Sequence, residues 1–195
     1  MSRELMEHIR KFVSLDEASA DSVSGECHPE SFKKKAFLLR EGQLCRKDYF
    51  VVSGCLRMFF IDEKGQEQTT HFAIENWWMS DYRSYEHQTP SVFFIQAVED
   101  TRVLSLERDH QERLFTEVPV FCRYYGKVLQ RAYAASQLRV KLMKEYSREA
   151  LYHHFVSLFP DFVRRVPQYM LASYLGFTPE YLSEIRKKNK RKQIS

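Results

Sequence analysis

The segment spanning residues 166–187 combines two short helical stretches with almost no linker between them. Gly176 stands at the junction, where a tight turn requires the left-handed backbone that glycine adopts most readily. Thr178, Pro179 and Glu180 follow at once, and they suit the N-cap, the first helical position and the acidic first turn of a helix. The segment therefore predicts two helices that cross at a steep angle around a very short turn.

The two predicted helices also carry an apolar pattern that gives them a shared core. Ala172 supplies a small side chain at the point where the helices approach each other. The core residues that we expect are Met170, Leu171, Leu175, Phe177, Leu182 and Ile185. An ordinary helical hairpin is the alternative, but the small residue, the glycine, the cap and the core pattern together are typical of a helix-turn-helix.

Basic charge is concentrated beside this motif. From residue 161 onward there are eight lysines and arginines against three acidic residues, a net charge of +5, whereas the whole chain carries +4. Segregated positive charge attracts polyanions, and nucleic acid is the commonest of these. A solvated basic tail is the alternative for the charge taken alone, so it is the charge and the motif together that predict DNA binding.

We expect the second helix to lie in the major groove of double-stranded DNA, with its basic end near the phosphates. The residues predicted to contact DNA are Gln168, Thr178, Pro179, Glu180, Tyr181, Ser183, Glu184, Arg186, Lys187 and Lys188. Carboxylates at the groove floor accept hydrogen bonds from the amino group of cytosine, whereas lysines near the backbone attract any sequence. The expected function is sequence-specific transcription regulation without enzymatic activity.

The middle of the chain has a different pattern, rich in β-branched and aromatic residues and cut by turn signals. The strands that we expect are Phe37–Arg40, Tyr49–Val52, Cys55–Ile61, Glu67–Ala73, Phe93–Val98 and Thr101–Leu106. The turn Asp62–Gly65 predicts a hairpin between two of them. Short strands with regular punctuation indicate an all-β sandwich or barrel, preceded by a helical segment at Leu5–Val23.

From Val118 the pattern becomes helical, and a second helix is expected over Ser147–Phe159. The first helix carries an apolar seam at alternating spacings of four and three, interrupted by Arg139 and formed by Phe121, Tyr125, Val128, Ala132, Ala135 and Leu142. Such a seam favours a homodimer on a pseudo-palindromic operator. Packing of the same stripe on the chain's own β-domain is the alternative.

Other features limit the class of protein. The longest apolar runs are far too short to cross a membrane, and residues 1–10 contain no signal-peptide core, so we expect a cytoplasmic protein. The four cysteines show no close pairs, so neither a metal site nor an iron–sulfur cluster is expected. A metal-dependent cupin-type barrel would need a His-x-His pattern, but His71 stands alone on its strand. A β-barrel interaction protein without a DNA role is the remaining alternative.

The order of these parts resembles that of the Crp/Fnr family of transcription regulators. The resemblance rests on residues 49–57, 62–65 and 97–101 and on the Ala172–Lys187 module. It implies an α+β chain with a cyclic-nucleotide-binding-type β-roll (a double-stranded β-helix or jelly-roll) at residues 1–117. A dimerisation helix at 118–145 and a winged helix-turn-helix domain at 146–195 would follow, with RNA polymerase as a further candidate partner.

Two departures from the family pattern matter. The residues that hold the cyclic phosphate in cyclic-AMP-binding members are replaced here, and the phosphate-binding arginine is absent beside Ser91. We therefore expect an effector other than cyclic AMP, with a candidate pocket, or alternatively plain core, at Trp77, Trp78, Ser80, Asp81, Tyr82, Arg83 and Ser91. The second departure is that only residues 188–195 follow the second helix, so the wing is expected to be reduced to a basic arm.

Overall fold

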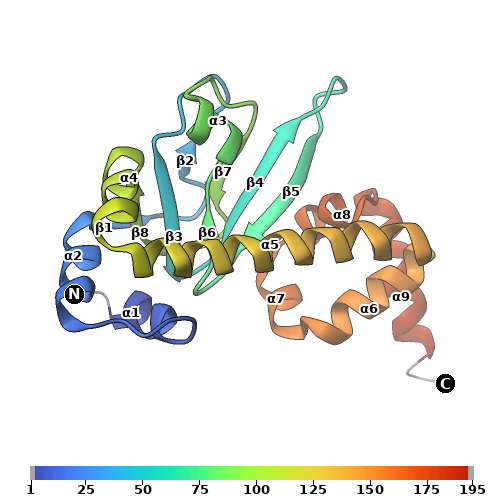
Figure 1. The fold of residues 1–195 in the computed structure, drawn as a ribbon. Coiled ribbons are helices and arrows are strands. Elements are labelled where there is room, and N and C mark those ends of the chain that lie inside the picture. Colours follow the sequence, from blue (N-terminus) through green and yellow to red (C-terminus); the bar gives the residue numbers. More distant parts are fainter. Residues whose placement is uncertain (1–2, 193–195) are drawn as a thin grey trace. The chain divides into compact units, whose positions relative to one another are not determined.

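The computed structural model describes the backbone of residues 3–192 and the side chains of residues 3–188. The chain divides into two compact units, each described by itself (Figure 1). The sheet unit comprises Met1–Phe60 and His71–Ala132, and the helical unit comprises Ile61–Thr70 and Tyr133–Ser195. The boundaries at residues 60 and 70 divide a β-hairpin between the two units, and the boundary at residue 132 divides a long helix.

The described residues form eight strands in two four-stranded sheets, and the ends of β4 and β5 at their shared turn belong to the helical unit. The strands are β1 (Cys27–Phe32), β2 (Phe37–Leu39), β3 (Lys47–Ser53), β4 (Leu56–Ile61), β5 (Glu67–Ala73), β6 (Trp78–Met79), β7 (Phe94–Ala97) and β8 (Thr101–Glu107). One sheet has the order β1-β8-β3-β6 and the other the order β2-β7-β4-β5. The α+β class and the N-terminal β-domain are thus confirmed.

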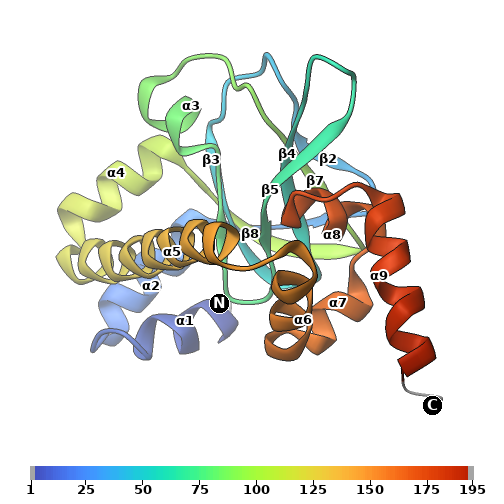
Figure 2. The ribbon, with the colours of Figure 1, turned by 90° about the vertical axis from the view of Figure 1, so that its right-hand side faces the viewer.

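Helices cover one face of the first sheet (Figure 1 and Figure 2). They are α1 (Arg3–Arg10), α2 (Glu17–Glu26), α4 (Arg108–Glu117) and the first half of α5 (Pro119–Glu145). Strand β3 alternates between two cores, because Phe50 packs with these helices whereas Tyr49 and Val51 pack between the sheets. Phe121 and Tyr124 of α5 are completely buried against the helix-covered face. Packing on the first sheet therefore holds the N-terminal part of α5 in place.

Four elements of this unit, β1, β6, α3 and α4, were missing from the sequence prediction, and the predicted N-terminal helical segment is two helices. Strand β1 contains Pro29, which an edge strand tolerates because its outer N–H groups need no partner. Strand β6 has only two residues, and α3 (Tyr82–His87) only six. The helical segment at Leu5–Val23 is divided by a break, after which the Asp16 side chain caps α2.

The predicted hairpin is confirmed. Strands β4 and β5 are neighbours, and the turn between them is closed by the Asp62 N–H, which donates to the Gln66 carbonyl at 3.0 Å. The Asp62 carboxylate accepts hydrogen bonds from the backbone N–H groups of Lys64 and Gln66. Gly65 has a φ of +74°, which a side chain would disfavour. The turn chemistry therefore fixes the register of both strands.

The helical unit continues α5 and adds α6 (Arg148–Leu158), α7 (Pro160–Arg165), α8 (Gln168–Leu175) and α9 (Pro179–Lys192). The predicted Ser147 cap is present, since its hydroxyl accepts from the Ala150 N–H at 3.3 Å. Between residues 146 and 192 the described backbone forms no strand, so any wing would have to lie outside the described residues. No helix of the described chain is long and apolar enough to cross a bilayer.

A fully buried carboxylate joins β3 to α5. Asp48 accepts hydrogen bonds from the Tyr49 N–H and from the Tyr125 hydroxyl. Burial raises the pKa of Asp48 to about 7, although these hydrogen bonds oppose the shift. The neutral carboxyl is therefore the form that this part of the core favours.

This burial predicts a pH-dependent stability. An unfolded aspartate has a pKa of about 3.9, so between that value and the folded pKa of about 7 the folded state holds a proton that the unfolded state has lost. The stability contributed by the neutral carboxyl should therefore be lost as the pH rises through 7, by a few kcal/mol at most.

Denaturant unfolding from pH 4 to pH 8 checks this expectation. Asp48→Asn should flatten the profile, because an amide does not ionise, whereas Asp21→Asn on the exposed face of α2 should leave the profile unchanged. Equal profiles for the wild type and Asp48→Asn would contradict the assignment.

Candidate nucleic-acid interface and sensor pocket

The turn between α8 and α9 has the predicted geometry. Gly176 ends α8 with a φ of +77°, and the N–H of Phe177 donates to the Ala172 carbonyl at 2.8 Å. The Thr178 hydroxyl accepts from the Tyr181 N–H at 3.3 Å, which caps α9, and Pro179 is its first residue. The local sequence signals therefore stop one helix and start the next within three residues.

All the predicted core residues of this module are buried. Ala172 is fully buried, in keeping with close helix packing, and the other members of the predicted set are each less than a tenth exposed. Leu151 and Tyr152 of α6 complete the cluster. The α8–α9 pair is thus held by its own apolar core, which leaves the outer face of α9 free to contact another molecule.

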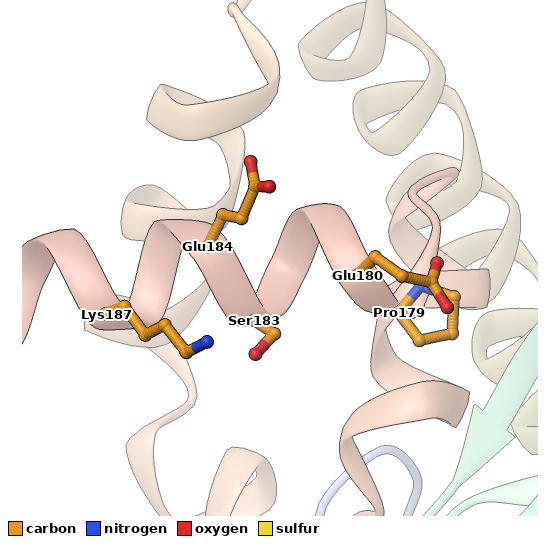
Figure 3. Close-up of a pocket in the computed structure, with 5 residues that line it drawn as sticks. All are labelled: Pro179, Glu180, Ser183, Glu184 and Lys187. Atoms are coloured by element: carbon orange, nitrogen blue, oxygen red, sulfur yellow. The ribbon is translucent and has the colours of Figure 1, made fainter.

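The exposed face of α9 gathers five of the predicted DNA-contacting residues around a shallow hollow (Figure 3). They are Pro179, Glu180, Ser183, Glu184 and Lys187. Figure 3 shows Lys187 and Ser183 on one side of the helix and Glu184 on the other, with Glu180 beside Pro179 at the start. This face offers two carboxylates, one hydroxyl and one ammonium group to a partner.

The remaining predicted residues lie elsewhere. Tyr181 is half-buried against the Phe177 ring, with the ring centroids 5.8 Å apart. The Gln168 amide donates to the Val163 carbonyl at 3.4 Å. Arg186 is exposed. Burial raises the pKa of Tyr152 on α6, and the charge of Arg186 opposes part of that shift. Lys188 is exposed, whereas the side chains of Lys190, Arg191 and Lys192 lie outside the described residues.

The residues predicted to line a sensor pocket divide into two groups. Trp77 is 51% exposed, and Arg83 also lies at the surface. Trp78 is core, and its indole N–H donates to the Tyr124 hydroxyl at 2.9 Å. Ser80, Asp81 and Ser91 are buried polar residues. The aromatic residues of this stretch therefore do not form one wall.

The Asp81 side chain uses the hydrogen-bond donors at the start of α3. Its carboxylate accepts from the N–H groups of Arg83 at 3.1 Å and Ser84 at 3.3 Å, which caps α3. The Ser91 hydroxyl donates to the second carboxylate oxygen at 2.7 Å. A phosphate placed here would meet a buried carboxyl group that already uses the nearby donors.

Tyr82 and Cys45 show how closely this region is packed. Tyr82 is 39% exposed as a residue, yet burial of its phenol, with a smaller effect of Asp48, raises its pKa well above the usual value. Burial raises the pKa of the Cys45 thiol, which lies 3.2 Å from the Ser80 hydroxyl. Among the described residues no three His, Cys, Asp or Glu side chains gather into a group that could hold a metal ion.

Comparisons with known proteins agree with this architecture. Residues 29–117 match the model of the cyclic nucleotide-binding domain. A curated relative, the transcriptional activator protein Anr of Pseudomonas protegens, is 27% identical over 78% of this chain. The match spans 66% of that relative, slightly less than two thirds of its length.

Solved structures share the fold at low sequence identity. The c-di-GMP-responsive global regulator CLP of Xanthomonas campestris has a TM-score of 0.76 at 11% identity, covering 91% of this chain and 93% of that one. FixK2 of Bradyrhizobium japonicum has a TM-score of 0.69 at 16% identity, covering 86% of each chain. The catabolite activator protein of Thermus thermophilus has a TM-score of 0.57 at 20% identity, covering 93% of this chain and 87% of that one.

The domain match, the activator relative and the arrangement of a two-sheet domain, a long helix and a C-terminal helix-turn-helix agree with one another. Residues 29–117 therefore form a cyclic nucleotide-binding-type domain, and the chain as a whole is similar to transcription regulators of the Crp/Fnr family.

Proposed function

We propose that this protein binds a specific DNA sequence through α9 and controls transcription in response to an effector other than cyclic AMP. The observation that carries the proposal is the α8–α9 module, whose core is complete and whose α9 presents polar side chains to solvent. A helix of this kind fits the major groove, where side chains distinguish all four base pairs. The relation to an activator protein also supports a regulatory role.

The chemistry of the exposed face suggests that different residues along α9 determine sequence preference and general affinity. Glu180 and Glu184 are acceptors, suited to the amino group of cytosine and repelled by phosphate. Lys187 and Lys188 lie further along the helix, where an ammonium group attracts the backbone of any sequence. Sequence preference and general affinity should therefore depend on different residues.

A dimer is the second part of the proposal, and the burial along α5 favours a different seam from the one the sequence suggested. Phe121 and Tyr125 are buried in the core of their own chain. A second seam at alternating spacings of four and three is formed by Cys122, Gly126, Leu129, Tyr133, Ser136, Val140 and Met143. All of these residues are exposed except Leu129, which is half-buried against the core of the sheet unit. Tyr133 is 67% and Val140 is 52% exposed, as expected for an unpaired coiled-coil face.

Replacement of single α9 side chains should separate specificity from affinity. Glu180→Ala is expected to relax base preference at one operator position, with a loss of discrimination of roughly 1–3 kcal/mol. Lys187→Ala should weaken binding to every sequence and lower the salt slope by about one unit per half-site. Selection from a random duplex library, followed by salt titrations, measures both effects. Unchanged base preference for Glu180→Ala would contradict the docking.

Charge placed in the exposed α5 seam should dissociate the dimer. The double variant Tyr133→Asp with Val140→Asp is expected to raise the dimer dissociation constant at least about tenfold, because it buries unpaired carboxylates in the interface. Leu158→Asp is the matched control, since Leu158 is 56% exposed on α6 and lies outside the seam. Sedimentation velocity measures the oligomeric state, and a wild type that stays monomeric at micromolar concentration would refute the seam.

Cyclic AMP should not bind with useful affinity, because the Asp81 carboxylate already uses the donors at the start of α3. Calorimetric titration into the millimolar range is expected to give no saturable heat. Micromolar binding would overturn this expectation. Arg83→Ala would then test whether that exposed cation, the one nearest in sequence to Asp81, holds the phosphate.

A further inference from the structure

The backbone of strand β5 is bound by a side chain of the helix-turn-helix. Strand β5 lies at the edge of its sheet, with β4 on one side of it. The Ser173 hydroxyl of α8 accepts from the Thr69 N–H at 2.8 Å and donates to the Glu67 carbonyl at 2.8 Å. One hydroxyl thus contacts alternate residues of the edge, as a neighbouring strand would.

Arg139 of α5 makes a second connection. Its guanidinium donates to the Thr70 carbonyl at 2.6 Å and to the Tyr174 carbonyl at 2.6 Å. The same group lies 3.9 Å from the centroid of the Tyr174 ring. The Tyr174 carbonyl is at the C-terminal end of α8, where helical carbonyls lack an intrahelical partner and a cation is favourable. Arg139 therefore ties the hairpin to the end of α8, just before the turn at Gly176.

We infer that these contacts form a latch, defined as Ser173 and Arg139 on the backbone of residues 67–70, that positions the helix-turn-helix for DNA binding. The inference rests on the proposed DNA-binding function. In the structure the latch is closed and the outer face of α9 is exposed, so the latched form leaves α9 able to contact DNA. The latch fixes the C-terminal half of α8 and, through the turn, the direction in which α9 leaves it.

The polar character of the latch makes it able to open. The apolar core of the helical unit is built from α5, α6, α7, α8 and α9, and among the described residues no member comes from the hairpin segment Ile61–Thr70. The hairpin is therefore attached mainly through hydrogen bonds, each of which contributes little net stability because water competes for the same groups. The same hairpin continues along the chain into the strands of the sheet unit, so a change there has a covalent route to the latch.

Amide exchange of the full-length protein tests the latch without DNA. Ser173→Ala removes the acceptor of the Thr69 N–H, and exchange at Thr69 should accelerate by roughly tenfold. Arg139→Lys keeps the charge but loses the two-pronged geometry, and a smaller acceleration is expected. Ser157→Ala is the matched control, because the Ser157 hydroxyl donates to a carbonyl of its own helix. Arg123→Lys is the control for an exposed arginine on α5.

Operator binding by the same variants tests the positioning role. Ser173→Ala and Arg139→Lys should weaken operator binding about fivefold or more with an unchanged salt slope, since no phosphate contact is lost. Unchanged Thr69 exchange would overturn the latch, and accelerated exchange with unchanged or tighter operator binding would overturn its positioning role. If the wild type bound no duplex at all, the proposed function would fail together with the positioning role, whereas the exchange result would still decide whether the latch forms.

Discussion

The packing of α5 on the first sheet is the interaction on which the rest of the structure depends. Phe121 and Tyr124 have no exposed surface, and Tyr125 adds a hydrogen bond to the buried Asp48. Farther along, every residue from 130 to 138 is exposed. A helix whose N-terminal part is buried and whose following residues are exposed can form one interface with its own chain and another with a partner.

The sheet unit contains two buried aspartates whose side chains are hydrogen-bonded within the chain. Asp48 and Asp81 are both less than a tenth exposed, and the chain's own N–H and O–H groups surround each of them. Buried carboxyl groups need these hydrogen-bond partners, because a buried polar group without a partner is unfavourable. The interior around them is therefore already satisfied, which disfavours an anionic ligand and gives a physical reason for the departure from the cyclic-phosphate pattern that the sequence shows near Ser91.

The sequence predicted the helix-turn-helix well because its determinants are local. Gly176, Thr178 and Pro179 act within one turn of themselves, and the hairpin turn at Asp62 and Gly65 is equally self-contained. The sequence prediction missed elements that depend on partners distant in the chain. Strand β1 tolerates its proline only because β8 pairs with it on one side, and the two residues of β6 form a strand only beside β3. Neither condition is visible in a local pattern.

The predicted seam on α5 combines buried and exposed positions, and the position of Arg139 in the stripe indicates why. An arginine in the middle of an apolar stripe indicates that the stripe does not face a single apolar surface. In the structure, Phe121, Tyr125 and Val128 pack on the sheet unit, whereas Ala132 and Ala135 are exposed. Leu142 packs in the helical unit, and Arg139 itself binds two backbone carbonyls. The exposed seam at Tyr133 and Val140 is rotated by about one residue, roughly 100°, around the helix. Two neighbouring faces of α5 therefore serve different purposes, and a dimer on the exposed face would leave the Arg139 contacts intact.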